Sequence, residues 1–162
     1  MLIHHIVVPI DAVDATVHDL RPILLIARRF DAHVTLLDCY VQPACFDFAV
    51  GDSALESILL YRRNVRARLY DLTKEARKLY SQCDCCFVDG SSFVQIVRQS
   101  RNMSADLIAV PLTFDVINGC WGPRDLFDEL IRTADCPVLC MLGRERRPLS
   151  KPCVGGKGLL AA

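Results

Sequence analysis

The chain has 162 residues with 19 basic and 19 acidic side chains, so its formal charge is zero. A chain of this length can bury roughly 70% of its unfolded surface as one domain without disulfides. Zero net charge gives no general attraction to nucleic acid or to an acidic membrane, and we expect neither as a partner. The sequence also lacks the roughly 20-residue apolar stretch that spans a bilayer and the features of a signal peptide, so we expect a cytoplasmic protein.

The first expected element is a strand over residues 2–10, whose nearly continuous apolar character is typical of a parallel strand covered on both faces. His4 and His5 open this strand and point to opposite faces, so they cannot bind one metal together. Asp11 follows at the carboxyl end. Its carboxylate is placed either to accept hydrogen bonds from a ligand or to stabilise the turn before the next helix, and the spacing leaves both roles open.

A helix is expected over residues 16–30, followed by a strand over residues 33–40 that is rich in β-favouring side chains. Pro22 is tolerated only in the first turn of a helix, so this helix either begins near Asp19 or bends at the proline. Asp38 lies late in the strand, near the same sheet edge as Asp11. A buried carboxylate needs a partner, so Asp38 is either a polar group of a pocket or a residue that pairs with a helix cap.

The longest helical pattern covers residues 53–81, after a loop at residues 41–52. Its apolar seam has spacings of three and four and comprises Ile58, Val65, Leu69, Leu72, Ala76 and Leu79. The other faces carry seven basic side chains: Arg62, Arg63, Arg66, Arg68, Lys74, Arg77 and Lys78. Such a charge run is usually a solvated helix face, which is the interpretation we favour over nucleic-acid binding.

Three further strands are expected over residues 85–89, 106–111 and 136–142. Gly90, Ser91 and Ser92 provide a turn and a cap for a helix that ends before Asn102. A fourth helix begins at Pro123, after a cap at Gly122. Residues 143–162 are basic and rich in glycine and proline, and we predict a disordered tail after a domain over residues 1–142.

Five strands that alternate with four helices predict an α/β fold, a single doubly wound parallel sheet with right-handed crossovers and helices on both faces. In such sheets ligands bind at the carboxyl ends of the strands, where the strand order reverses. The loop after residues 106–111 leaves that edge. We find no P-loop lysine motif, no dinucleotide-binding glycine motif, no metalloprotease helix motif and no nucleophile elbow, and we assign no catalytic residue.

Nine cysteines are an odd number, and four of them, Cys39, Cys86, Cys136 and Cys140, lie inside apolar runs. In a reducing compartment most of the nine are expected to behave as small buried hydrophobes. Cys83, Cys85 and Cys86 form one cluster, and Cys136 and Cys140 form a second. A zinc site needs the clusters to converge, but on a sheet of the order given below they occupy opposite edge strands about 19 Å apart. We therefore predict no metal site.

At this point the sequence resembles the universal stress protein family, whose sheet order is 3-2-1-4-5. The resemblance covers residues 2–142 and rests on five segments in the family's order: Val7–Asp11, His33–Leu37, Val88–Gly90, Ala105–Val110 and Ala134–Leu139. It implies that Pro9, Asp11, Cys39 and Val110 occupy positions around an adenosine pocket. It also implies a homodimer formed through the edge strand Cys136–Leu142, which carries no charge that would deter pairing with another chain.

Relatives that bind ATP resemble one another in a Gly-x-x-Gly after the fourth strand and a Gly-Ser or Gly-Thr near the next helix, where backbone N–H groups close on phosphate. In this chain these positions carry Pro111 and Phe114, then Arg124 and Asp125. Proline has no N–H, phenylalanine fills space, and a carboxylate repels phosphate. The resemblance therefore implies a relative that does not bind ATP in the family manner.

Three hypotheses follow. The first is a regulatory stress-response domain that is not an enzyme, forms a homodimer, has no expected cofactor and can contact another protein. The second is an adenine-nucleotide switch or slow ATPase that binds ATP or AMP, in which Asp11 remains and Arg124 replaces the backbone donors as a clamp on phosphate. The third is a thiol redox-responsive protein that uses Cys83, Cys85 and Cys86.

Overall fold

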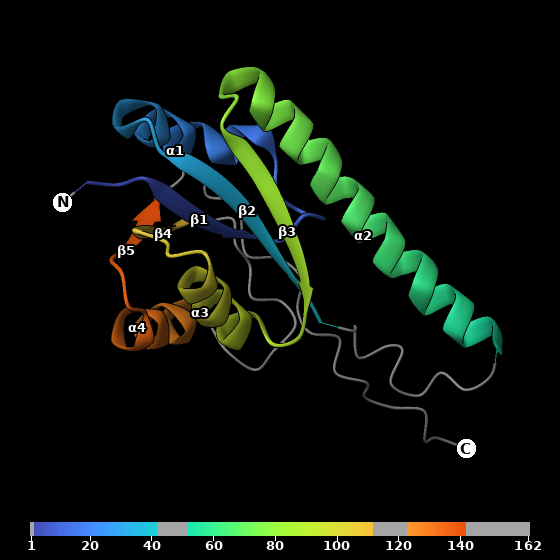
Figure 1. The fold of residues 1–162 in the computed structure, drawn as a ribbon. Helices are drawn as coiled ribbons and strands as arrows, with labels where there is room; N and C mark the ends of the chain where they lie inside the picture. Colours follow the sequence, from blue (N-terminus) through green and yellow to red (C-terminus); the bar gives the residue numbers. More distant parts are fainter. Residues whose placement is uncertain (1, 42–51, 112–122, 142–162) are drawn as a thin grey trace, which may run out of the picture.

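The computed structural model describes residues 2–41, 52–111 and 123–141. Along these ranges the chain forms β1 (His5–Ile10), α1 (Val17–Phe30), β2 (His33–Tyr40), α2 (Asp52–Leu79), β3 (Cys83–Asp89), α3 (Ser92–Asn102), β4 (Leu107–Pro111), α4 (Pro123–Thr133) and β5 (Val138–Met141). All strand pairs are parallel, and the sheet order is β3-β2-β1-β4-β5 (Figure 1). The predicted fold class and strand order are confirmed.

The sheet separates two apolar cores. On one face, side chains such as Ile6, Val8 and Leu36 pack against α1 and α2. On the other face, Val7 and Leu37 pack against α3 and α4 (Figure 1). Because adjacent strand residues point to opposite faces, the continuous apolar runs of β1 and β2 supply both cores.

Several predicted boundaries move by one to three residues. β1 begins at His5 rather than at residue 2, because its ladder to β2 begins with the pair His5 and His33. β3 begins two residues early, at Cys83, opposite Val34. The helix α3 has its N-cap at Ser91. β5 is shorter than predicted, at Val138–Met141, where its four residues pair with the last four residues of β4.

The helix α1 begins one residue after the expected start at residue 16 and before the alternative start near Asp19. It starts at Val17, and Pro22 lies inside it. The carboxylate of Asp19 accepts hydrogen bonds from the Thr16 amide at 2.9 Å and the Thr16 hydroxyl at 2.7 Å, so the first turn is fastened despite the proline. The capping interaction explains why the helix does not wait for the residues after Asp19. The turn into β2 uses Asp31, which adopts a left-handed conformation.

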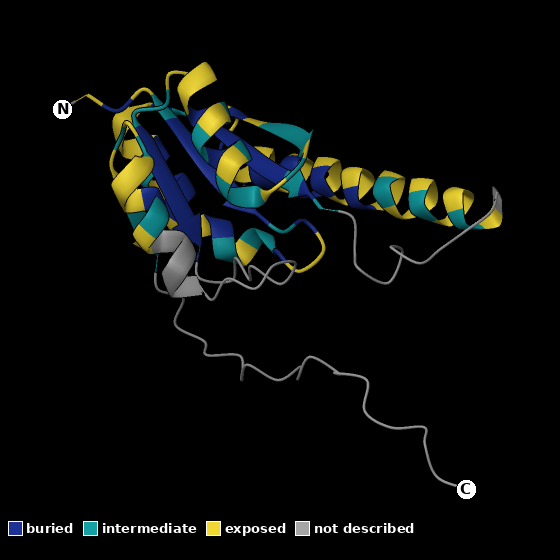
Figure 2. Ribbon diagram, turned by 90° about the horizontal axis from the view of Figure 1, so that it is seen from below, coloured by how far each residue is buried: buried dark blue, intermediate teal, exposed yellow. Residues whose placement is uncertain are grey.

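The helix α2 is too long for the sheet that it covers. Its 28 residues extend for about 42 Å, whereas the seven residues of β3 extend for about 23 Å. Val65, Leu69, Leu72 and Ala76 are buried as predicted, but Ile58 is only half-buried and Leu79 is exposed. The amino-terminal half of α2 therefore projects beyond the sheet (Figures 1 and 2).

The tail after Met141 lies outside the described residues, as do the loops at residues 42–51 and 112–122. In the described ranges, no helix combines the length and the apolar character needed to cross a membrane.

Candidate functional site at the carboxyl edge of the sheet

The strand order reverses between β1 and β4. The chain proceeds from β1 to β2 and β3 on one side, and β4 is followed by β5 on the other. The ladder between β1 and β4 joins only Ile6 to Leu107 and Val7 to Ile108, whereas β1 pairs with β2 along its whole length. The two strands therefore separate toward their carboxyl ends, which is the geometry that opens a ligand crevice in doubly wound sheets.

Asp11 follows β1 at this crevice and organises the turn into α1. Its Oδ1 accepts a hydrogen bond from the Val13 amide at 2.9 Å, and its carbonyl oxygen accepts one from the Ala15 amide at 2.8 Å. A carboxylate that binds the backbone two residues ahead forms an Asx turn. The turn role that the spacing left open is therefore present.

Asp38 lies near the end of β2, and its side chain stabilises the same turn. Its Oδ2 accepts a hydrogen bond from the Ala12 amide at 2.8 Å, and its side chain is buried. Burial raises the pKa of Asp38 to about 6, the hydrogen bond from Ala12 opposes this shift, and the nearby Asp11 carboxylate adds to it. The site thus holds two acidic groups around one turn, where negative charge on both is unfavourable.

The remaining predicted pocket residues form an apolar wall. Cys39 and Val110 belong to the face that packs on α3 and α4, and Pro9 lies on the same face because it is two residues after Val7 in β1. Burial raises the pKa of the Cys39 thiol, so the group is a protonated wall residue. The structure brings Pro9, Asp11, Cys39 and Val110 to one edge on neighbouring strands.

The positions predicted for the phosphate side of the pocket are Pro111, Phe114, Arg124 and Asp125. Pro111 is the last residue of β4, is buried, and pairs with Met141 of β5. Phe114 lies outside the described residues, and the side chains of Arg124 and Asp125 also lie outside the described part, although the backbone of α4 begins at Pro123. The phosphate side of the predicted pocket is therefore represented here by Pro111 alone.

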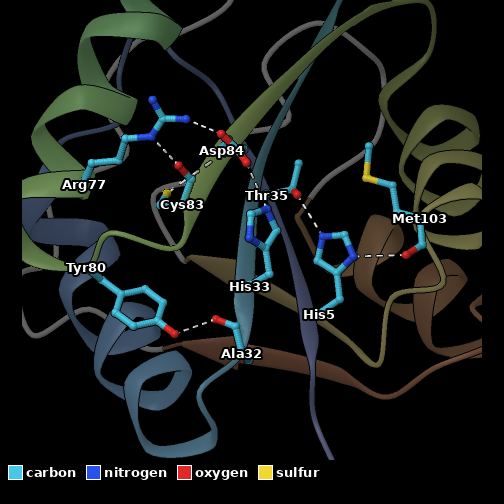
Figure 3. Close-up of polar contacts among 9 residues, drawn as sticks. All are labelled: His5, Ala32, His33, Thr35, Arg77, Tyr80, Cys83, Asp84 and Met103. Atoms are coloured by element: carbon cyan, nitrogen blue, oxygen red, sulfur yellow. Dashed lines mark hydrogen bonds and ion pairs between the residues drawn. The ribbon is translucent and has the colours of Figure 1, made fainter.

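The opposite, amino edge of the sheet carries a polar network that the sequence did not reveal (Figure 3). His5 joins three segments: its Nε2 lies 2.8 Å from the Thr35 hydroxyl of β2, and its Nδ1 lies 3.0 Å from the Met103 carbonyl oxygen after α3. A carbonyl only accepts, so Nδ1 donates to Met103, and in a neutral ring Nε2 accepts from Thr35. These partners are 30 and 98 residues from His5, so no local pattern predicts them.

The network continues along this edge. The ring of His33 meets that of His5 edge-on at 5.3 Å and lies 3.2 Å from a carboxylate oxygen of Asp84, which is also paired with Arg77 of α2. Asp106 accepts hydrogen bonds from the His4 and His5 amides, at 2.8 and 3.0 Å, which lower its pKa. These contacts pair the polar groups of the amino edge with one another, so we assign this edge a structural role.

The two cysteine clusters lie apart. Cys83 and Cys85 pack on the α1 and α2 face, whereas Cys86 packs on the other, and β3 and β5 are at opposite edges of the sheet. Burial raises the pKa of Cys83 to about 12 and also raises the pKa of Cys86, which lowers the fraction of reactive thiolate. Within the described ranges no group of three His, Cys, Asp or Glu side chains is placed to hold a metal ion.

A hollow of about 190 Å³ lies between the end of α3 and the approach to β5. Ser100, Arg101, Asp135 and Cys136 contribute to its lining, and Arg101 is paired with Asp135 at its surface. This hollow is next to the starts of β4 and β5, so it does not belong to the carboxyl-edge site.

Comparisons with known proteins give matches among the solved structures. No protein-family model matches the chain, and no curated protein matches it either. A universal stress protein family member from Burkholderia pseudomallei has a solved structure that is 20% identical, with a TM-score of 0.63, and the match covers 86% of this chain and 96% of that chain.

Some of the similar structures contain nucleotides. The universal stress protein from Archaeoglobus fulgidus in complex with dAMP is 16% identical, with a TM-score of 0.53, over 86% of this chain and 98% of that chain. A universal stress protein in complex with cAMP is 19% identical, with a TM-score of 0.54, over 87% and 98%. Together with the sheet order 3-2-1-4-5, these matches confirm the resemblance seen in the sequence: the chain has the fold of the universal stress protein family.

Proposed function

We propose that this chain is a regulatory domain of the universal stress protein type, not an enzyme, and that it does not bind ATP in the family manner. The observation that carries the proposal is Pro111, which is buried at the end of β4 where ATP-binding relatives begin their glycine motif. Proline has no N–H to donate to a phosphate. A triphosphate therefore loses a donor at the point where β1 and β4 separate.

The adenosine side of the site supports a narrower ligand class. Asp11 stands at the carboxyl end of β1, and Cys39 and Val110 provide an apolar wall on neighbouring strands. The structurally similar proteins in complex with dAMP and cAMP carry nucleotides with one phosphate. If this site binds any nucleotide, recognition falls on the base and ribose, and additional phosphates contribute no affinity.

Calorimetric titration of the full chain with adenosine, AMP and Mg-ATP at a few hundred micromolar tests this proposal. We expect either no stoichiometric heat from any of the three, or binding in which ATP is no tighter than AMP. Asp11→Asn is the matched variant for any binding observed, because it keeps the size of the side chain and removes its charge. Stoichiometric binding of ATP with at least tenfold preference over AMP contradicts the proposal.

The alternative is a nucleotide switch or slow ATPase in which Arg124 clamps phosphate. The nucleotide complexes of similar structures favour it, since they belong to proteins with the same fold. Arg124→Ala is the discriminating change, and Arg132→Ala in the last turn of α4 is its control. The alternative requires that only Arg124→Ala abolishes ATP binding and release of phosphate.

We also propose that the domain forms a homodimer through β5, in the cytoplasm of its cell. β5 is an edge strand, and Cys140 on it is exposed. The Pro137 carbonyl oxygen accepts a hydrogen bond from the Ile108 amide. Residues of a strand alternate in the direction of their N–H and C=O groups, so the N–H groups of Val138 and Cys140 point away from β4, toward a second chain.

Cys140→Pro tests the dimer, because it removes an outward N–H while the ladder to β4 keeps its own donors. Cys140→Thr is the matched control, with a β-favouring side chain. Light scattering at 100 µM is expected to show a dimer for the wild type and the threonine variant, and a monomer for the proline variant. A monomeric wild type at this concentration removes the dimer from the proposal.

A further inference from the structure

The projecting half of α2 carries apolar side chains that the other described elements leave exposed. Leu55, Leu59 and Leu60 have exposed fractions of 56%, 53% and 58%. Figure 2 shows this part of the helix extending past the sheet, with exposed residues along it. Scattered single leucines are normal on a protein surface, but three within two turns of one projecting helix form a patch.

Part of this patch belongs to a continuous line along the helix. At 100° per residue, Leu55, Leu59, Arg66 and Tyr70 fall within an arc of about 60°, roughly one quarter turn from the buried seam of Val65 and Leu69. We call these four residues the outer stripe. Tyr70 is half exposed, and the Arg66 guanidinium lies 5.7 Å from the centre of its ring. The stripe thus has an apolar end and a cationic, aromatic end.

The charge around the outer stripe is one-sided. Beside the stripe the helix carries Glu56 as an acidic side chain and Arg62, Arg63 and Arg66 as basic ones, a net charge of +2, whereas Arg68 falls on the opposite side of the helix. Arg62 is paired with Asp89 at 2.5 Å. In the described residues, Arg63 and Arg66 have no ion pair with an acidic side chain. Within the described part of the chain, the charge of these two arginines is therefore not neutralised by an acidic side chain.

We propose that the outer stripe is a docking surface for an amphipathic helix of another protein, with a leucine-type seam flanked by acidic residues. The stripe runs straight for 16 residues, about 24 Å, which suits a helix laid along it. Its leucines supply apolar contact, and its arginines select acidic flanks. A second copy of this chain brings the same excess of positive charge, which opposes self-pairing along the stripe.

This proposal is independent of the carboxyl-edge site. The proposed protein-binding surface lies on α2, which packs on the β3 side of the sheet. The strand β5 is at the opposite edge of the sheet (Figure 1). A dimer formed through β5 leaves both copies of the outer stripe accessible.

Three synthetic 18-residue helical peptides test the ligand class with the full chain. The first has leucines at a helical seam and glutamates beside them, the second has the same seam with lysines, and the third keeps the glutamates but has glutamines in the seam. Fluorescence anisotropy at 150 mM salt is expected to show binding of the first peptide at least tenfold tighter than either other. Equal binding of the first and second peptides overturns the charge argument, and equal binding of the first and third overturns the apolar one.

Substitutions on the exposed surface locate the contact. Leu55→Gln with Leu59→Gln, and separately Arg66→Glu, are each expected to weaken binding of the first peptide at least tenfold. Leu25→Gln on α1 and Arg98→Glu on α3 are matched controls away from the stripe, and both are expected to leave the affinity unchanged. Thermal melting of each variant checks that the fold is retained. Binding that is unaffected by the stripe variants overturns the proposal.

Light scattering separates this surface from self-association. If the wild type forms oligomers that Leu55→Gln with Leu59→Gln dissociates and Cys140→Pro does not, the occupant is a second copy and the proposed acidic partner is wrong. A mass that depends only on Cys140→Pro, together with the expected peptide preference, supports the docking surface.

Discussion

The two edges of this sheet carry polar side chains in different states. At the amino edge, His5, Thr35 and Met103 join three segments through hydrogen bonds, and Asp106 accepts from two backbone amides. At the carboxyl edge, the buried Asp38 carries a raised pKa near the carboxylate of Asp11, and β1 and β4 separate. The polar groups of the amino edge stabilise the folded state through hydrogen bonds. The carboxyl edge places two carboxylates close together, which lowers the stability of the folded state.

The difference suggests that the amino edge contributes to stability and that the carboxyl edge contributes to function. A carboxylate that gains hydrogen bonds and a lowered pKa stabilises the folded state at neutral pH, as Asp106 does. A carboxylate that is desolvated near a second acid destabilises it, as Asp38 does. Perturbation of the unfavourable kind is concentrated at functional sites. The contrast therefore points to the carboxyl edge as the ligand edge.

The largest effect is expected from His5→Ala. This change leaves the buried Thr35 hydroxyl and the Met103 carbonyl oxygen without their ring partner, so we expect a loss of about 3 kcal/mol in the free energy of unfolding. Urea unfolding at pH 7.5 measures it. In the double variant with Thr35→Val the loss should be smaller than the sum of the two single losses. A loss below about 1 kcal/mol would show that the hydrogen bonds of the amino edge contribute little to the free energy of unfolding.

Asp38→Asn is expected to act in the opposite direction. The folded pKa, about 6, lies above the ordinary value of 3.8, so the folded state binds the extra proton and wild-type stability falls as pH rises through 6. The amide retains an oxygen acceptor for Ala12. At pH 7.5 we expect the variant to be more stable by about 1–2 kcal/mol, within the limit of about 3 kcal/mol that such a shift allows.

The advantage of Asp38→Asn should disappear near pH 4, where the wild-type carboxyl is protonated in the folded state. Urea unfolding across pH 4–8 provides the comparison. An Asp38→Asn variant that is less stable than wild type at pH 7.5 would mean that the charge itself stabilises the turn.

Asp106→Asn is expected to have a smaller effect of the stabilising-charge kind. Hydrogen bonds from the His4 and His5 amides lower the pKa of Asp106, so its contribution to stability is present above the ordinary value of 3.8 and is lost as pH falls through the lowered value. The variant should be less stable at pH 7 and equal to wild type in strong acid. Thermal melting at pH 7 and pH 3 measures the difference, and an equal deficit at both values counts against this origin.

Asp84→Asn should change stability least. Asp84 contacts both Arg77 and His33, but its side chain is more than half exposed, and ion pairs of this kind contribute about 0–1 kcal/mol. Urea unfolding in low and high salt measures the effect. A loss comparable with that of His5→Ala would show that the amino edge depends on its surface ion pairs rather than on the buried hydrogen bonds.

The sequence predicted the architecture because each element has a local signature. Apolar runs identify the strands, and the five family-like segments indicated the order that the sheet has. Boundaries depend on partners: β1 begins only where β2 can pair with it, at His5. The seam of α2 was periodic from Ile58 to Leu79, but periodicity does not report how far the sheet extends beneath the helix.

The candidate site was predictable in part. Asp11 and Asp38 were identifiable because each stands at the end of an apolar strand, and the sheet places such ends at one edge. The hydrogen bond from the Ala12 amide to Asp38 was not predictable, since it joins segments 26 residues apart in sequence. The pairing of His5 with Thr35 was hidden for the same reason, and a threonine inside a strand ordinarily indicates only β propensity.

The most direct measurement is a titration of the ¹⁵N-labelled full chain with Mg-ATP to 1 mM, followed through backbone amide chemical shifts. The account predicts no saturable shifts at Asp11, Ala12 and Cys39 beyond those that adenosine alone produces at the same concentration. Saturable shifts at Pro111's neighbours Val110 and Leu112 with ATP but not with adenosine would place the triphosphate at the carboxyl edge and contradict the account.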